Sequence, residues 1–216
     1  MSLRILITGF GPFAGFHFNP TQVLAAELVR RPHPAFSRVI RRSHVFPVSY
    51  QAVDHELPKL IANESPDALI MFGLAGRTKE LRIETCARNG RSRLMPDISG
   101  YLPAKGRIDA TGPPIVPLRS PVKRLLMAVQ STGLPAVLSR DAGRYLCNYL
   151  CWRAADAARN GGPRLVTFIH VPAVHGAHIR RGNAGAFTLD DLMQAGEAIL
   201  RAVVAARPQS LPFTSC

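Results

Sequence analysis

The chain has 216 residues, of which 47% are hydrophobic and 19% are charged, and Lys and Arg together exceed Asp and Glu by 13. These values are typical of one globular domain, or at most two small ones, and exclude a wholly disordered chain. No stretch of about eighteen uncharged apolar residues occurs, so the sequence predicts no membrane span.

The N-terminal part predicts a strand followed by a helix. Leu3–Phe10 is a nearly continuous apolar run that ends beside glycine, as a buried strand does. Asn19 and Pro20 are favoured at the N-cap and the first turn, so a helix is expected from there to about Arg31. The first residues lack a long apolar stretch and a small-residue cleavage site, so we expect no signal peptide and a cytoplasmic location.

Two further strands and one helix are expected before residue 75. A strand is predicted around His44–Tyr50. The next helix contains Asp54 and Leu60, and Pro58 either kinks it or resets its start. Ala68–Leu74 is a second buried apolar run.

The middle of the chain is less regular. Leu81–Ala87 is expected to be extended. From Pro96 to Pro121, both included, the chain holds six prolines, too many for a long helix or a central strand. We therefore predict an irregular excursion, or a hairpin, over residues 96–121 on the surface of the same domain.

The rest of the chain returns to alternating helices and strands. The expected elements are a helix at about Val122–Gln130, a short strand at Ala136–Ser139, a helix across Tyr145–Ala158, a strand across Leu165–Val171, and a final helix capped by Thr188 and Asp191 that ends near Ala206. Such alternation predicts a single α/β domain of three layers over residues 1–216, with a mainly parallel central sheet flanked by helices.

Functional groups of open α/β sheets gather where strands end and helices begin. Four segments meet this condition: GFGPF after the first strand, GLAG after the second buried strand, DAGRYLCN at the start of a helix, and FIHVP at the end of a strand. Neither GFGPF nor GLAG matches a phosphate-binding or dinucleotide-binding motif, so nucleotide binding has little support.

Cys147 is a candidate nucleophile. It lies near the start of a predicted helix, where unpaired backbone N–H groups and the helix dipole favour a thiolate and could form an oxyanion hole. The alternative is a small buried residue on a helix face, which is also the interpretation for Cys151 one turn later. Four Cys in a chain without a signal peptide do not suggest a disulfide framework.

His170 and Glu84 are candidates for a general base and the acid that orients it. An apolar strand brings His170 to the edge of the sheet, where a general base would sit, whereas a core histidine bonded to a carbonyl is the alternative. Glu84 either holds the imidazole tautomer or forms a surface ion pair with Arg82 or Arg88.

Metal and nucleic-acid ligands are not expected. His175 and His178 have a spacing that can bind metal, but no carboxylate or Cys stands close by in the sequence. The basic residues occur as scattered pairs, without a long tract, a zinc-finger spacing or an aromatic RNA-binding motif. A solvated, Arg-rich surface accounts for the charge.

Several segments in a fixed order resemble the pyroglutamyl-peptidase I (pyrrolidone-carboxylate peptidase) family of cysteine peptidases. They span most of the chain and are Leu6–Phe13 with Asn19-Pro20, Gly73–Arg77, Glu84 with Ala87 and Asn89, Pro96-Asp97, Asp141–Asn148 and Phe168–Pro172. The ordered set, and no single motif, carries the resemblance. It implies one α/β domain, removal of an N-terminal pyroglutamyl residue from peptides without a metal or organic cofactor, and a homodimer or homotetramer.

The pattern of the family, carried over residue by residue, makes Cys147 the nucleophile, His170 the base and Glu84 the acid. Their positions along the chain favour the same three residues independently.

A pyroglutamyl residue is a flat, uncharged lactam, so its pocket should be apolar, with a few hydrogen-bond partners and no carboxylate for an ammonium group. The resemblance places six residues there: Phe10, Phe13, Asn19, Leu74, Tyr145 and Leu146. Ordinary core packing is the alternative for the two Phe.

Two positions depart from the pattern of the family. The family often has Gln where Leu74 stands, so one polar contact is expected to be missing. It usually has Arg at the position of Leu94; either the neighbouring Arg93 takes its place after a local shift, or the site is altered. These departures leave the catalytic trio untouched and concern substrate range and rate.

Two rival functions remain at the level of sequence. One keeps the fold but hydrolyses another small amide or lactam. The other is a basic, non-enzymatic binder of nucleic acid or acidic protein.

Overall fold

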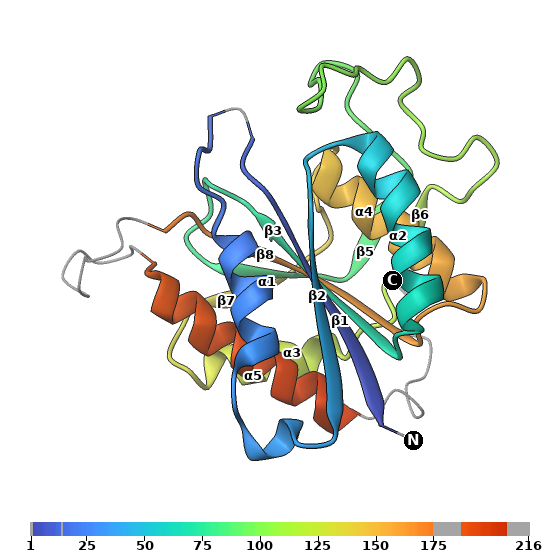
Figure 1. The fold of residues 1–216 in the computed structure, drawn as a ribbon. Coiled ribbons are helices and arrows are strands. Elements are labelled where there is room, and N and C mark those ends of the chain that lie inside the picture. Colours follow the sequence, from blue (N-terminus) through green and yellow to red (C-terminus); the bar gives the residue numbers. More distant parts are fainter. Residues whose placement is uncertain (1, 14, 175–186, 207–216) are drawn as a thin grey trace.

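A computed structural model describes residues 2–13, 15–174 and 187–206. Helices cover both faces of a central sheet, which gives three layers (Figure 1). One face carries α1 (Pro20–Arg30), α3 (Val122–Gln130) and α5 (Leu189–Ala206), and the other carries α2 (Tyr50–Glu64) and α4 (Leu146–Arg159). The predicted fold class is confirmed.

The main sheet has the strand order β2-β1-β3-β8-β4-β7. Its strands are β1 (Leu3–Phe10), β2 (Val39–Phe46), β3 (Ala68–Leu74), β4 (Leu81–Glu84), β7 (Ala136–Ser139) and β8 (Leu165–Val171). Pairing is parallel from β2 to β8, whereas β4 is antiparallel to β8 and parallel to β7. The sheet is thus mainly parallel, and β4 and β7 run against the other four strands.

Five elements begin and end at the residues predicted from the sequence: β1, β3, α3, β7 and β8. The boundaries of α1 and α4 differ from the prediction by one residue. Thr188 and Asp191 form the expected capping box of α5, because each side chain accepts a hydrogen bond from the backbone N–H of the other.

The prediction for β2 is wrong by several residues. The strand covers Val39–Phe46 and not His44–Tyr50, because it pairs with β1 along the full length of both strands. The partner strand, and not local apolarity, therefore sets its limits. Ser49 caps α2 by accepting a hydrogen bond from Ala52 N (3.4 Å), and the helix runs through Pro58, so that proline does not reset its start.

The segment expected to be extended at 81–87 divides into two strands. After β4 the chain turns into β5 (Cys86–Arg88), which pairs antiparallel with β6 (Ile115–Pro117) in a second, two-stranded sheet. Residues 89–114 between them are largely irregular, as the prolines predict (the green segment of Figure 1).

Buried polar side chains hold this irregular segment in place. Asp97 accepts hydrogen bonds from the backbone N–H groups of Tyr50, Ser99 and Tyr101. Burial raises the pKa of the Asp97 carboxyl, but hydrogen bonds from Ser99, Tyr50 and Tyr101 outweigh it and leave the pKa below its usual value. The segment is therefore anchored to α2 by a charged, fully bonded carboxylate.

Each face of the sheet has its own apolar core. Alternate residues of a strand point to opposite faces, so Ile5 and Ile7 of β1 pack with α1, α3 and α5, whereas Leu6 and Phe10 pack with α2 and α4. None of the described helices combines the length and the apolar character that crossing a lipid bilayer would require.

Gly9 allows α1 to approach β1. A Cβ atom at this position would lie 2.2 Å from the carbonyl oxygen of Thr21, in the first turn of α1. We expect Gly9→Ala to lower the free energy of unfolding by about 3 kcal/mol, because backbone atoms cannot yield as a side chain can. Thermal unfolding should show a fall in Tm of about 6–12 °C.

Gly11→Ala is the matched control, since its Cβ would have Phe46 O, at 3.8 Å, as its nearest neighbour. Equal destabilisation by the two substitutions would show that the close approach of α1 is not what requires glycine.

Candidate functional site

Three elements bring Cys147, His170 and Glu84 together. Cys147 is the second residue of α4, His170 is the second last residue of β8, and Glu84 is the last residue of β4. His170 Nδ1 and Glu84 Oε1 are 2.9 Å apart, and His170 also forms a hydrogen bond with Cys147. The three candidates thus form a connected thiol–imidazole–carboxylate chain.

Antiparallel pairing of β4 with β8 supplies the carboxylate. Glu84 stands opposite Phe168, two residue pairs deeper in the sheet than His170, which faces Arg82. Residues two apart on a strand share a face, so Glu84 and His170 both point towards α4. The carboxylate therefore reaches the imidazole from within the sheet and not from its edge.

Burial increases from the thiol through the imidazole to the carboxylate. Cys147 is half-buried, His170 is 6% exposed and Glu84 is 0% exposed. Within the described part of the chain, Glu84 Oε2 has no hydrogen-bond partner, so His170 is the described polar partner of this carboxylate. Because Nδ1 is engaged by Glu84, Nε2 is the ring nitrogen left for Cys147.

The surroundings of His170 favour its protonated form. Burial lowers the pKa of the imidazole, but the charge of Cys147, the hydrogen bonds with Cys147 and Glu84, and the charge of Glu84 together raise it from 6.5 to about 9. At neutral pH the site therefore holds an imidazolium within hydrogen-bond distance of the thiol, and a positive charge in this position favours the thiolate, the reactive form of cysteine.

The start of α4 presents unpaired N–H groups next to the thiol. Tyr149 N bonds to Tyr145 O (3.0 Å), whereas the N–H groups of Leu146, Cys147 and Asn148 precede any intrahelical acceptor. The N-cap residue, Tyr145, makes no side-chain capping hydrogen bond. These donors and the helix dipole both favour negative charge at the position of Cys147.

The neighbouring cysteines have different surroundings. Cys151 is 0% exposed, and burial, followed by the charges of Glu84, Cys86 and Cys147, raises the pKa of its thiol well above the usual value. Cys86 is buried too, and its thiol donates to Arg140 O. Cys151 therefore fits the interpretation of a packed, neutral thiol, and Cys147 is the more exposed of the three.

Gly73 on β3 makes room for the thiol. A Cβ atom there would lie 2.8 Å from Cys147 Sγ and 2.6 Å from the ring of Phe168. Gly73, the first glycine of the GLAG segment, is therefore required by the close approach of β3 to the start of α4, and not by an unusual backbone conformation.

A cavity of about 570 Å³ opens in front of Cys147 and His170. This volume lies within the range of small-molecule sites. All six residues predicted to bind substrate line it: Phe10, Phe13, Asn19, Leu74, Tyr145 and Leu146. Glu84 does not, since it lies behind His170.

Asn19 lines this cavity and already makes three hydrogen bonds within the protein. Its side chain accepts hydrogen bonds from Thr21 N (3.2 Å) and Thr21 Oγ1 (2.8 Å) as the N-cap of α1, and donates to Gly11 O (3.0 Å). It therefore fixes the loop that follows β1, which carries Phe13, and one amide hydrogen remains for a ligand.

Arg93 does not line the catalytic cavity. It lines a neighbouring cavity, whereas Met95, from the same irregular segment, lines the catalytic one. The hydroxyl of Tyr145 donates to Pro96 O (2.8 Å) and so ties this segment to the start of α4. Sequence reasoning missed Met95, because only the folded path of an irregular segment decides which of its side chains reaches the site.

Asn148 is a second residue that the sequence analysis left without a role. Its amide accepts from Arg88 N (2.9 Å) and donates to the carbonyl oxygens of Arg88 and Gly90 (2.8 Å each). The residue after the candidate nucleophile thus fastens α4 to β5. An asparagine directly after a candidate nucleophile, inside a predicted helix, is the sequence signal that could have suggested this anchoring role.

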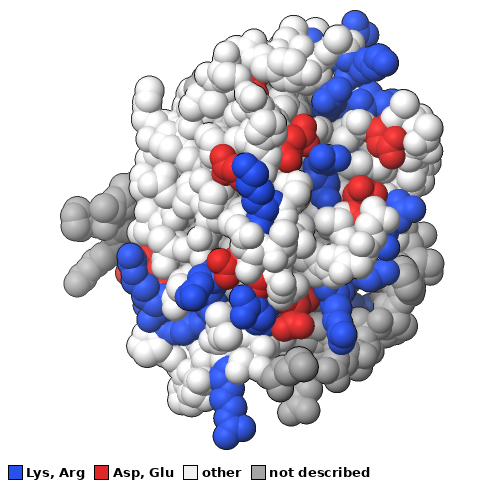
Figure 2. Space-filling view, turned by 45° about the vertical axis from the view of Figure 1, so that its right-hand side comes forward, with Lys and Arg blue, Asp and Glu red and all other residues white. Residues whose placement is uncertain are grey.

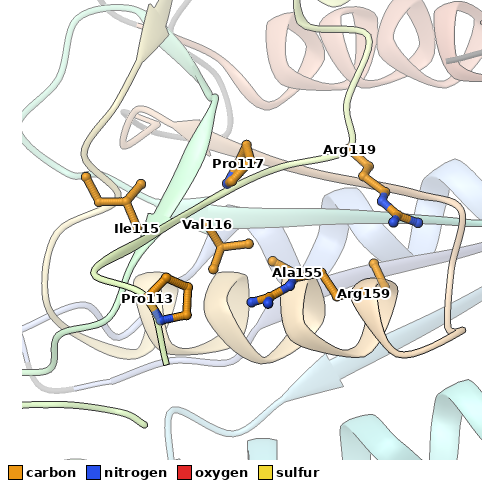
Figure 3. Close-up of a pocket in the computed structure, with 8 residues that line it drawn as sticks. Pro113, Ile115, Val116, Pro117, Arg119, Ala155 and Arg159 are labelled. Carbon is orange, nitrogen blue, oxygen red and sulfur yellow. The ribbon is translucent and has the colours of Figure 1, made fainter. Parts of the chain in front are cut away.

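A smaller cavity of about 140 Å³ lies between α4 and β6 (Figure 3). Its walls are mainly apolar, with Arg119 and Arg159 beside them, and none of the predicted site residues lines it. Among described side chains no group of metal-ligating residues converges, and His175 and His178 lie outside the described residues.

Comparison with known proteins identifies the family. The family model described as "Pyroglutamyl peptidase" matches residues 3–208. The chain belongs to the pyroglutamyl peptidase family. It is a cysteine-type peptidase that removes N-terminal pyroglutamate from peptides, and the resemblance inferred from the sequence is confirmed.

Relatives match over nearly their whole length. The pyrrolidone-carboxylate peptidase of Thermococcus onnurineus is 31% identical over 202 residues, which are 92% of this chain and 98% of that protein. The enzyme of Lactobacillus helveticus is 33% identical over 193 residues, 88% of this chain and 94% of that protein.

Solved structures agree with this assignment. Pyrrolidone carboxyl peptidase from Thermococcus litoralis matches with a TM-score of 0.85 and 26% identity over 100% of both chains. Pyroglutamyl peptidase I of Bacillus amyloliquefaciens gives a TM-score of 0.80 and 27% identity, over 93% of this chain and 97% of its own.

The raised pKa of His170 predicts the alkaline limb of the pH–rate profile. In the wild type, kcat/KM should fall at high pH with an apparent pKa of about 9 as the imidazolium loses its proton. The ion pair should stabilise the fold fully below pH 6.5, and this stabilisation should be lost as the pH rises through about 9. In Glu84→Gln the alkaline limb should move to lower pH, because the carboxylate raises the pKa of His170.

Glu27→Gln removes one carboxylate from α1, on the opposite face of the sheet, and should leave the profile in place. An alkaline limb that does not move in Glu84→Gln would contradict the coupling of Glu84 to His170.

Proposed function

We propose that Cys147, His170 and Glu84 carry out the peptidase reaction as nucleophile, general acid and base, and orienting carboxylate. The observation that carries this proposal is the connected thiol–imidazole–carboxylate chain at the wall of the 570 Å³ cavity. The Cys147 thiolate attacks the carbonyl carbon of the pyroglutamyl residue, and unpaired N–H groups of the first turn of α4 stabilise the oxyanion.

His170 then completes both halves of the reaction. The imidazolium gives its proton to the leaving amine as the C–N bond breaks, which leaves a thioacyl enzyme. The neutral imidazole next takes a proton from water, which attacks the thioester and releases pyroglutamate. The proton on His170 and the thiolate are restored, so the cycle balances.

The charges around the cavity favour a lactam over a free amine. Among the described residues, those that line it include three arginines, Arg77, Arg82 and Arg144, and one carboxylate, Asp141. Asp141 is already paired with Arg88 at 3.4 Å. An N-terminal ammonium would therefore meet positive charge and apolar walls, whereas the uncharged lactam meets no such penalty.

Matched peptides test this preference directly. The kcat/KM of a peptide that begins with pyroglutamate should be at least about a hundredfold higher than that of the matched peptide that begins with glutamine or glutamate. The reason is that burying an ammonium in an apolar slot costs on the order of 3–5 kcal/mol. Comparable turnover of free-amine and pyroglutamyl peptides would instead support hydrolysis of another class of amide.

Substitution of the two neighbouring thiols tests the nucleophile. Cys147→Ser should reduce kcat at least about a thousandfold in a folded protein, because a hydroxyl is a far weaker nucleophile beside this base. Cys151→Ala should keep kcat within about threefold per folded molecule and cost about 1–2 kcal/mol of stability, as a buried packing residue does.

Alkylation by iodoacetamide, mapped by mass spectrometry, provides an independent measurement. Cys147 should react first, and its labelling should track the loss of activity. First labelling of Cys151 or Cys86, with full activity retained after Cys147 reacts, would show that the nucleophile is another residue.

We further propose a homodimer or homotetramer. Five large apolar side chains of the irregular segment are solvent-exposed in this chain, from Leu94 (89%) to Leu102 (48%): Leu94, Met95, Ile98, Tyr101 and Leu102. Exposed apolar side chains in one segment favour burial against another copy.

We also propose a cytoplasmic location, because the proposed reaction needs Cys147 as a free thiol, and a reducing environment keeps thiols unoxidised. Nucleic acid is not expected as a partner.

A further inference from the structure

A second cavity, of about 600 Å³, lies beside the catalytic one. It is formed by the end of β5, the irregular segment that follows and the residue three positions before Cys147. Five arginines line it: Arg88, Arg91, Arg93, Arg107 and Arg144. No Asp or Glu is among the described residues that line it.

Few negative charges oppose these arginines. Asp141 pairs with Arg88 at 3.4 Å, and Asp109 interacts with Arg107, so two carboxylates stand near five guanidinium groups. Arg107 donates its described hydrogen bonds to the carbonyl oxygens of Asp109 (3.3 Å) and Gly112 (2.7 Å). Carbonyl oxygens satisfy donors without cancelling the charge, so the cavity stays electropositive.

Buried amides give this cavity a fixed shape. The side chain of Asn89 accepts from Ile108 N and Asp109 N (2.9 Å each) and donates to Asp109 O and Gly112 O. Arg91 Nε donates to Lys105 O (3.0 Å) across the same segment. The backbone that carries the arginines is therefore already ordered in the folded protein, so binding a ligand does not require the loss of its conformational entropy.

The arginine-lined cavity borders the catalytic cavity. Arg144 lines both, and Ser92 N, at the wall of the second cavity, donates to Arg144 O. An extended peptide advances by about 3.3–3.6 Å per residue, so the few residues after a scissile bond at Cys147 can reach this wall.

The geometry points to a subsite for acidic side chains in the part of the peptide that leaves. This inference rests on the proposed function and names a substrate class for it: pyroglutamyl peptides with Asp or Glu beyond the first residue after the scissile bond. A carboxylate can form bidentate hydrogen bonds with a guanidinium group.

An acidic peptide fits this cavity better than a nucleic acid does. A phosphate backbone needs an extended basic groove or stripe. On the face shown in Figure 2, acidic side chains lie among the basic ones, and no continuous basic stripe crosses it. The concave cavity has room for a few side chains.

The test compares kcat/KM for C-terminally amidated peptides that differ at two positions, pyroglutamyl-Ala-Glu-Glu-amide, pyroglutamyl-Ala-Gln-Gln-amide and pyroglutamyl-Ala-Lys-Lys-amide. The wild type should cleave the Glu peptide about fivefold more efficiently than the Gln peptide at low ionic strength, and the Lys peptide least. The preference should shrink in about 0.5 M NaCl, since these charges are partly exposed.

Variants locate the preference. In the double variant Arg93→Gln, Arg107→Gln the ratio of Glu to Gln peptide should fall to about one. The matched control, Arg124→Gln, Arg201→Gln, removes the same charge from exposed positions on α3 and α5, on the other face of the sheet, and should keep the preference. Because each ratio is taken within one variant, a general loss of activity cancels.

Three outcomes would overturn the inference: a wild-type ratio of one at low salt, an equal loss of preference in both double variants, or stoichiometric inhibition by duplex DNA that only Arg93→Gln, Arg107→Gln relieves. Failure of the proposed function is seen separately, as no release of the fluorophore from a pyroglutamyl coumarin amide, which has no acidic residue.

Discussion

A carboxylate buried without solvent contact needs a positive partner, and the hydrogen bond between Glu84 and His170 supplies it. The pair fixes the imidazole ring, because Nδ1 is committed to Glu84 at 2.9 Å and Nε2 is left for Cys147. It also keeps a positive charge next to the thiol, in a place where burial alone would expel that charge. In the proposed mechanism, the reactivity of Cys147 thus depends on Glu84, which does not line the catalytic cavity.

The sheet makes this interaction available through its departure from parallel order. If β4 ran with β8, Glu84 would be carried to the same edge as the end of β8, where solvent would screen it. Running against β8, the strand delivers Glu84 deeper than His170 and on the same face. Gly73 on β3 then leaves space for the thiol to approach from α4.

The irregular segment between β5 and β6 contributes to the walls of two cavities of different character. Anchored by Asp97 and Asn89, it sends Met95 to the catalytic cavity and Arg93 to the arginine-lined one. The first suits an uncharged ring because Asp141, the one carboxylate among its described lining residues, is already paired, and the second concentrates part of the basic excess of the chain. In the proposed arrangement, charge therefore distinguishes the two ends of a peptide substrate.

The sequence by itself determined the elements whose signals are local. Continuous apolar runs bounded by glycine or proline predicted β1, β3 and β8. Asn19 and Thr188 predicted the starts of α1 and α5. These predictions succeeded because capping and burial act within a few residues. The positions of Cys147, His170 and Glu84 at the ends of predicted elements made them candidates, and the family resemblance gave them their roles. Only the tertiary structure decided the limits of β2, the reversed direction of β4, and the separation of Arg93 from Met95, since each depends on a partner distant in the sequence.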